Sequence, residues 1–303
     1  MSKHMIMDAP AALGFVVSQR SHIETEVLRK PYPTIKYPRL IPVDTSANPF
    51  ALSVTHFAQD SVGRAKFING KGDDIPLVNI TGSKFEQTVN MAGVGYSFSL
   101  EEIGAAQMLG MNLSNDGAMA ARLAYEQFVD EVAFLGDTTI GVEGFYNMTG
   151  ITTAAAGATL AASTADAALG IINTALTTIE TTSYGIEVAD TIILPLKAAA
   201  TMERRMGDGA DVTILDFVMR NNRYTRQSGQ ALTVEFDWRL DALNKMVVYR
   251  RDPSVVKMHM PMPLQFIPPQ MVNLEVKVLG MFRFAPVNIR RPVAVRYVSG
   301  VTA

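Results

Sequence analysis

The strongest constraint in this sequence is a long strand pattern between Val54 and Phe98. Apolar and polar residues alternate there, most clearly after Phe85, which is typical of a β-strand with one covered face. The run NGKGDD at 69–74 contains two glycines and indicates a tight turn. The pattern therefore predicts a β-hairpin over 54–98 with its tip in that run. An isolated two-stranded hairpin is marginally stable in water, so this one must pack on something else.

The first 53 residues do not have the pattern of a compact unit. Five of the chain's 15 prolines lie between Pro31 and Pro49, and each proline fixes φ and removes a backbone donor. The residues between them include apolar side chains such as Tyr32 and Tyr37, which a solvated linker would lack. We therefore expect an extended arm over 1–53 that lies on another surface, its own or a neighbour's.

Two helices are predicted after the hairpin. Ser99 and Glu102 form a capping box that starts a short helix, and a longer helix is expected over 114–136 with Gly136 as its C-terminal stop. Apolar residues of the longer helix recur at helical spacing and predict its core side. The predicted core residues are Leu123, Phe128, Val132 and Leu135. The opposite side carries Glu126, Asp130 and Glu131, so the helix is amphipathic with one acidic side.

From residue 163 the pattern changes to alternating helices and strands. Helices are expected to start at a cap that is either Ser163 or Thr164 and at Thr213, and Thr191–Leu194 has the composition of a buried strand. Two further strands, 272–284 and 287–298, are expected to close the chain. The Ala- and Thr-rich run that ends at Ala162 is predicted to be an exposed loop.

Composition excludes several classes of function. The chain of 303 residues contains no Cys, which excludes disulfides and thiolate sites, and its net charge of −2 argues against a strongly basic nucleic-acid binder. The four His are far apart, and no phosphate-binding loop or nucleophile elbow is present. No residue is a candidate for catalysis, cofactor binding or metal ligation, so an enzyme is not predicted. The Arg pairs 204–205, 250–251 and 290–291 could contact phosphate, but they are more simply explained as strand-edge charges or ion-pair donors.

The charge pattern indicates contacts between subunits. Charged residues make up 18% of the chain, below the usual value of about 25%, and a surface this poor in charge is often covered by a partner. Residues 1–150 carry a balance of −5 and residues 151–303 a balance of +3. Head-to-tail contact between copies explains this asymmetry, and two solvated faces of one domain explain it as well.

Four stretches of the chain, in this order, resemble the major capsid proteins of tailed bacteriophages, which have the Hong Kong 97-type fold. They are Phe15–Gln19 with Tyr37–Asp44, Asp60–Gly70 with Asp73–Leu77, Gly95–Glu102 leading into Ala120–Arg122 and Phe134–Asp137, and Gly144–Asn147. The last is similar to a Gly-Leu-Leu-Asn motif of the family, with Phe145 and Tyr146 in place of the two leucines.

This resemblance implies an α+β fold with five parts. They are an N-terminal arm (1–53), an extended β-hairpin loop (54–98), a peripheral domain with a long spine helix (99–149), an axial α/β domain (150–271) and closing strands of the peripheral domain (272–303). It also implies a virion shell of hexamers and pentamers that encloses double-stranded DNA without sequence-specific binding. The shell would assemble in the host cytoplasm with portal, scaffold and decoration proteins as further partners, and without a cofactor or a membrane.

Contacts between subunits are expected at the hairpin tip and in the arm. The residues concerned are Lys71, Asp73 and Asp74 at the tip, and Tyr32 and Tyr37 in the arm. Two alternatives stay open at this point. One is an encapsulin-type nanocompartment shell protein, and the other is a monomeric α/β enzyme or binding domain without a recognisable motif.

Overall fold

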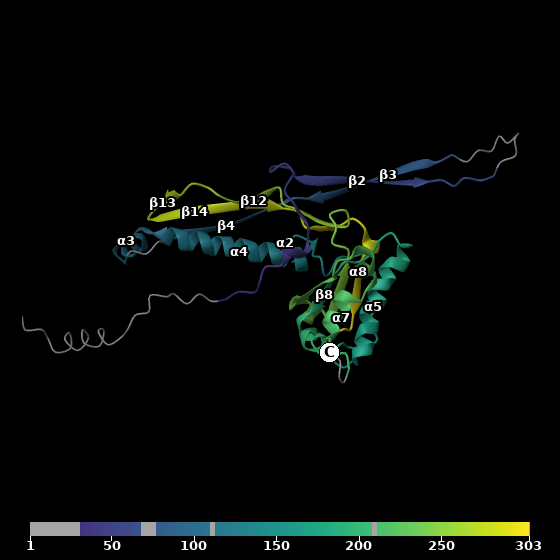
Figure 1. The fold of residues 1–303 in the computed structure, drawn as a ribbon. Helices are drawn as coiled ribbons and strands as arrows, with labels where there is room; N and C mark the ends of the chain where they lie inside the picture. The colour runs from purple at the N-terminus through teal and green to yellow at the C-terminus, as the bar shows by residue number, and fades with distance from the viewer. Residues whose placement is uncertain (1–30, 68–76, 110–112, 208–210, 303) are drawn as a thin grey trace, which may run out of the picture. The chain divides into compact units, whose positions relative to one another are not determined.

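The computed structural model describes residues 31–67, 77–109, 113–207 and 211–302. The chain divides into two compact units, Met1–Thr34 and Ile35–Ala303. In the first unit only 31–34 are described, and these residues are exposed and have no regular secondary structure. The rest of the predicted arm, 1–30, lies outside the described residues. The second unit contains all the helices and sheets labelled in Figure 1.

Two helices stand where the sequence predicted them. Helix α3 (Leu100–Leu109) begins at the predicted capping box. The Ser99 hydroxyl accepts from the Glu102 backbone N–H at 3.1 Å, and the Ser99 N–H donates to the Glu102 carboxylate at 2.8 Å. Helix α4 (Leu113–Leu135) is the long helix. It ends at Gly136, whose φ of +78° lies in the left-handed region that favours glycine.

Helix α4 lies along a four-stranded antiparallel sheet (Figure 1). The strands are β4 (Asn90–Ser99), β12 (Met262–Phe266), β13 (Gln270–Val272) and β14 (Glu275–Phe284). Strand β14 is central, because β4 pairs with all ten of its residues on one side while β12 and β13 share the other. The rings of Tyr125 on α4 and Phe282 on β14 pack edge to face with their centroids 4.7 Å apart. This aromatic contact fixes the helix on the sheet.

The hairpin is shorter than predicted. Strand β2 (Ser53–Val62) pairs antiparallel with β3 (Asn79–Thr88) over ten residues. The alternating pattern continues past Thr88, but strand β3 ends there. After Val89 the next strand, β4, pairs with β14 instead of β2. Periodicity identifies a strand without naming its partner, so two consecutive strands with different partners were predicted as one.

A separate mixed sheet has five strands in the order β7-β16-β10-β8-β9. Its strands are β7 (Thr153–Ala155), β8 (Thr191–Pro195), β9 (Thr233–Asp237), β10 (Lys245–Tyr249) and β16 (Val295–Ser299). Helices α5 (Ala165–Thr182) and α7 (Ile214–Arg220) pack on one face of this sheet. Both begin at the predicted caps, Thr164 and Thr213, whose hydroxyls accept backbone N–H groups.

Two strands of this sheet differ from the expected division. Residues Thr153–Ala155 were expected in an exposed loop, but they form β7 and pair parallel with β16. Strand β16 was expected to return to the peripheral domain, but it completes the five-stranded sheet beside β10. Both differences concern pairing between segments far apart in the chain, which local composition does not encode.

Shorter elements complete the fold. They are α2 (Tyr37–Leu40), α6 (Ala199–Met202), α8 (Arg223–Ser228), α9 (Arg239–Leu243), β1 (Val43–Asp44), β5 (Gly136–Asp137), β6 (Val142–Glu143), β11 (Val256–His259), β15 (Val287–Ile289) and the 3₁₀ turns Leu196–Ala198 and Pro292–Ala294. Strands β1, β11 and β15 form a small sheet. Residues Tyr37, Leu40 and Ile41 are buried in the core of the second unit.

The buried side of α4 is rotated from the predicted one. Its buried apolar residues are Ala121, Tyr125, Val129, Val132, Ala133 and Phe134. Of the predicted core residues, Val132 is buried, Leu123 and Leu135 are half-buried, and Phe128 is 39% exposed. Phe128 therefore lies at the margin of the core, with its ring 6.1 Å from that of Phe282. The prediction placed the large ring of Phe128 in the core. The small Ala121 and Ala133 and the hydroxyl-bearing Tyr125 are buried there instead.

A matched pair of substitutions on α4 tests this correction. Val129 is 0% exposed, so Val129→Asp buries an unpaired carboxylate and is expected to abolish folding. Phe128→Asp places its carboxylate at the margin and is expected to cost about 1–2 kcal/mol. Urea unfolding of the purified chain, followed by circular dichroism, measures both. Equal losses in the two variants would contradict the rotated core side.

Candidate assembly surfaces

A buried ion cluster joins α4 to the five-stranded sheet. The Arg239 guanidinium, at the start of α9, lies between the carboxylates of Asp130 on α4 and Asp237 at the end of β9. It donates to both, with Nη1 3.3 Å from the nearer Asp237 oxygen. All three side chains are almost completely buried. Removing one partner of such a group leaves an uncompensated charge in the interior, so the cluster fixes the geometry of this junction.

The same carboxylates also hold two further segments. The backbone N–H groups of Lys36 and Tyr37 donate to one Asp130 oxygen at 2.9 and 2.8 Å. The Tyr146 hydroxyl donates to Asp237 at 2.9 Å, and burial raises the pKa of Tyr146 well above its usual range. The Asp130 carboxylate thus accepts from three groups on two distant segments. The chain before α2 is thereby attached to the same junction as α4 and α9.

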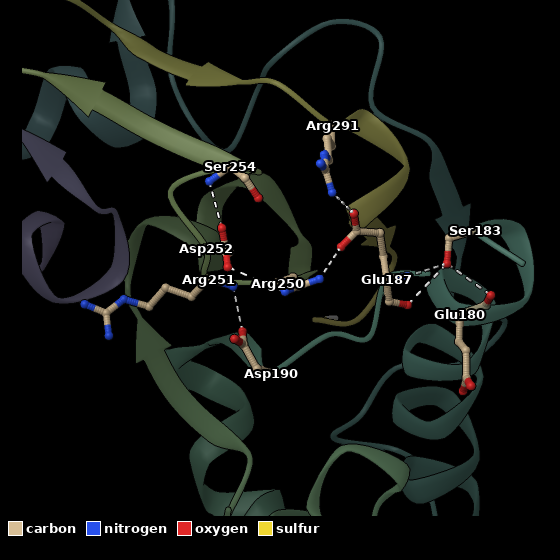
Figure 2. A network of polar contacts seen from close by, with 9 residues as sticks. All are labelled: Glu180, Ser183, Glu187, Asp190, Arg250, Arg251, Asp252, Ser254 and Arg291. Carbon is tan, nitrogen blue, oxygen red and sulfur yellow. Dashed lines mark hydrogen bonds and ion pairs between the residues drawn. The ribbon is translucent and has the colours of Figure 1, made fainter. Parts of the chain in front are cut away.

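A second network ties the loop after α5 to the strands beside it, as Figure 2 shows. The buried Glu187 carboxylate accepts from Arg250 at 2.8 Å and from Arg291 at 2.6 Å. At the other end of the loop, the Ser183 hydroxyl donates to the carbonyls of residues 180 and 187 and accepts the Glu187 N–H at 3.0 Å. The loop is therefore anchored at both ends, and the prediction that Arg250 and Arg291 are ion-pair donors is confirmed.

Asp190, just before β8, and Asp252, shortly after β10, belong to the same network (Figure 2). Asp190 accepts the Arg251 N–H at 2.7 Å, and burial raises its pKa above the usual range. Asp252 accepts the Ser254 N–H at 2.8 Å, and the hydrogen bonds from Ser254 lower the pKa of Asp252. Each carboxylate thus orders the backbone beside it, and Asp252 also pairs with Arg250 at 3.5 Å.

The hairpin presents apolar side chains to solvent. In the described part of the chain, β2 and β3 pair only with each other. Their exposed apolar residues, with those of the adjoining loop segments, are Phe57, Val62, Phe67, Leu77, Val78, Ile80 and Phe85. Phe57 alone is 74% exposed. A two-stranded ribbon with free edges and exposed rings is unstable and adhesive in water, so this surface suits contact with another chain.

The predicted contact residues have different outcomes. Lys71, Asp73 and Asp74 lie outside the described residues. Tyr32 is 52% exposed, and its contact with another subunit stays a prediction. Tyr37 is buried in its own chain, where its hydroxyl donates to Glu126 at 2.9 Å. The prediction that Tyr37 lies at a subunit contact is therefore corrected, because its ring fills the core that α4 covers.

No pattern in the sequence indicated the residues that build the junction. Asp130 was assigned to the acidic outer side of α4, and Arg239 and Asp237 matched no motif. Only the fold brings α4 and β9 together, since more than a hundred residues separate Asp130 from Arg239. A single acid on a helix gives no local clue to a partner that distant.

Neither a metal site nor a membrane-spanning helix is evident in the part of the chain that the structure describes. No three His, Asp or Glu side chains within 31–67, 77–109, 113–207 and 211–302 converge so as to hold a metal ion. None of the helices described there is both long and apolar enough to cross a membrane. The features that stand out are two rigid polar junctions and an exposed hairpin, which are features of a building block.

The junction can be tested with a matched pair of arginines. Arg239→Ala leaves Asp130 and Asp237 buried without their cation, and is expected to cost about 3–5 kcal/mol of unfolding free energy. Arg39→Ala removes an exposed ion pair with Glu235 and is expected to cost less than about 1 kcal/mol. Urea unfolding measures both losses. A loss for Arg239→Ala no larger than that for Arg39→Ala would remove the junction from this role.

Comparison with known proteins gives a consistent result. A family model described as major capsid protein matches residues 63–301. The capsid of Myoviridae phage XM1 superposes with a TM-score of 0.82 at 19% identity, over 94% of this chain and 98% of that one. The capsid of a native GTA particle gives 0.65 at 12% identity, over 98% and 100%. A virus-like particle from Pyrococcus furiosus gives 0.54 at 14% identity, over 86% and 91%. No curated protein matches the sequence.

Proposed function

Because this chain belongs to the major capsid protein family, we propose that it builds a closed shell from hexamers and pentamers of itself around double-stranded DNA. Its fold is the Hong Kong 97-type capsid fold that the sequence predicted. Its family is structural, so the chain is a capsid component of a tailed phage or phage-like particle and not an enzyme. Its place is therefore the shell of that particle.

The observation that carries the assembly proposal is the unpartnered hairpin. Strands β2 and β3 extend over ten residues each and leave apolar rings such as Phe57 and Phe85 exposed. Burial of apolar surface contributes roughly 25 cal/mol per Å², and the gain is repeated at every contact of a shell. A neighbouring copy that covers this hairpin stabilises both chains. The rigid junctions at Arg239 and Glu187 keep the rest of each subunit in one shape while this happens.

Non-specific enclosure of DNA agrees with the distribution of charge. The net charge is −2, and several arginines of the basic C-terminal half, including Arg239, Arg250 and Arg291, are engaged by carboxylates of their own chain. Proteins that bind DNA tightly neutralise many phosphates with free cations. The proposed shell therefore surrounds its DNA without reading its sequence. Portal, scaffold and decoration proteins are the further partners we propose, with assembly in the host cytoplasm.

The family model of major capsid proteins and the capsid of phage XM1, which superposes with a TM-score of 0.82, favour a phage shell over the encapsulin alternative. The two readings differ in cargo, because a nanocompartment holds protein and a phage shell holds DNA. Nuclease-protected DNA in particles purified from a phage lysate would support the phage shell, and particles filled only with an enzyme would support the alternative.

Shortening the hairpin tests its role in assembly. Ala58 pairs with Ser83, so replacing 59–82 by Asn-Gly closes the ribbon with a favoured two-residue turn. The shortened chain is expected to fold with nearly unchanged circular dichroism and to lose closed particles, because the removed ribbon lies outside the core. Light scattering and negative-stain microscopy measure particle formation. Closed shells from the shortened chain would exclude the hairpin as the essential contact.

The wild-type chain is the reference for this experiment. It is expected to form hollow particles, or rings of five and six, either alone or with a co-expressed scaffold protein. A chain that stays monomeric under both conditions would contradict the shell proposal itself, whereas particles from both chains would contradict only the hairpin contact. The two failures are therefore distinguishable.

The hairpin tip is tested separately by reversing its charges. The variant Lys71→Glu/Asp73→Lys/Asp74→Lys changes three residues that we expect to face a neighbouring subunit. Like charges brought together at a contact destabilise it, so we expect a lower particle yield and a lower temperature of particle disruption. Electron microscopy and a thermal shift assay on purified particles measure the two. Unchanged yield and heat resistance would remove the tip from the contact.

A further inference from the structure

The base of the hairpin contains a buried histidine among cations. His259, at the end of β11, is 5% exposed. Its Nε2 lies 3.3 Å from a guanidinium nitrogen of Arg290, and its Nδ1 lies 3.6 Å from a carboxylate oxygen of Asp44 on β1. The Lys257 ammonium is 2.5 Å from that same oxygen. The single carboxylate at this site is thus already paired with a lysine.

A second histidine reaches this region from the hairpin itself. The His56 ring on β2 stacks on the Phe85 ring of β3 with the centroids 5.2 Å apart. His56 and Arg290 line the same cleft, of about 720 Å³, between the hairpin and the segment 287–292. The cleft brings a titratable group of the hairpin to the cations of the body.

The contact with Arg290 requires the His259 ring to be neutral. An arginine side chain donates and does not accept, so the Nε2 of His259 must be an acceptor towards Arg290. Protonation of His259 removes that acceptor and adds a cation beside Arg290 and Lys257, with only Asp44 opposite. Protonation of His56 adds another cation to a cleft that Arg290 and Arg291 line from the body and Glu86 lines from the hairpin.

At the hairpin base the Gln87 amide nitrogen donates to the Pro286 carbonyl, and several buried polar atoms nearby lack a partner. Among the described residues, four buried side-chain atoms have no hydrogen-bond partner: Gln87 Oε1, His259 Nδ1, Arg283 Nε and Arg290 Nε. Residues 259, 283 and 290 lie on the body side of the hairpin base, and Gln87 lies on the hairpin. Unsatisfied polar atoms cost free energy, so little additional stabilisation is available there to offset a new charge.

We propose that His56 and His259 make the anchorage of the hairpin sensitive to pH, so that the hairpin is held at neutral pH and released in mild acid. Release here means loss of the fixed position of β2–β3 against the segment 287–292 that lines the cleft with it, with the internal pairing of the hairpin retained.

The direction follows from the environment of each group. Burial lowers the pKa of His259, and Lys257, Arg290 and His56 lower it further, while Asp44 opposes them. Burial and Arg290 lower the pKa of His56. Hydrogen bonds from Lys257 and Ser46 lower the pKa of Asp44, which stays charged throughout. The stabilisation from neutral imidazoles is complete above the usual histidine pKa of about 6.5 and is lost as the pH falls through the lowered values.

The absence of cysteine allows a direct measurement on the full chain. Spin labels at Ser61→Cys on the hairpin and Thr177→Cys on α5, both exposed positions, report the distance between hairpin and axial sheet. Between about pH 7.5 and about pH 5, where histidine titrates, we expect the distance distribution to shift or broaden. A reference pair at Thr177→Cys and Lys197→Cys, within the axial part, is expected to stay unchanged.

Substitution of the histidines separates their effect from other titrations. In His56→Gln/His259→Gln, Gln at 259 can still accept from Arg290, and the pH response is expected to disappear. His4→Gln/His22→Gln removes the other two histidines and is expected to leave it intact. If the double variant does not fold, His56→Gln alone, at a half-exposed position, is expected to reduce the response. A wild-type distribution that does not change with pH, or a full response in His56→Gln/His259→Gln, would overturn the proposal.

Discussion

The shape of this subunit depends on one buried guanidinium. Arg239 is paired with Asp130 and Asp237 in the interior, where an ion that lacks a partner costs several kcal/mol. Apolar residues could fill the same space with many small shifts in register, but this cluster is satisfied only when α4 and β9 meet at one position. Because Asp130 also accepts two backbone N–H groups of the segment before α2, that segment is set by the same contact.

The hairpin base is built in the opposite way. Around Arg239 each buried carboxylate has several donors, whereas around His259 the cations outnumber the one carboxylate and buried polar atoms lack partners. The first arrangement resists any change of geometry and the second tolerates one. The chain therefore combines a rigid body, reinforced at Glu187, with a ribbon whose attachment is cheaper to alter. In the proposed shell one chain enters both hexamers and pentamers, so a rigid body and an adaptable hairpin attachment would each serve assembly.

Local sequence was sufficient for elements whose determinants are local. The capping box at Ser99, the start of α5 at Thr164 and the left-handed stop at Gly136 depend on neighbouring residues, and all three are confirmed. Sequence reasoning was wrong where a distant partner decides. The strand after Thr88 pairs with β14 and not with β2, and Tyr37 enters a core formed by α4. The ion cluster at Arg239 was missed for the same reason, since Asp130 and Arg239 lie more than a hundred residues apart in the sequence.

Two groups of exposed apolar residues lie near opposite ends of strand β14, and this bears on how copies meet. One group lies on the hairpin, whose second strand ends at Thr88. Strand β4 begins two residues later, where Asn90 pairs with Phe284 at the end of β14. A second group, with Leu100 of α3 and Leu274, lies at the Glu275 end. Ten residues of extended strand separate these ends by about 30 Å. Two different surfaces suit head-to-tail contact, which closes into rings when the rotation allows. In the proposed shell, the hairpin of one copy and the strand end of another are therefore more suitable partners than two identical faces.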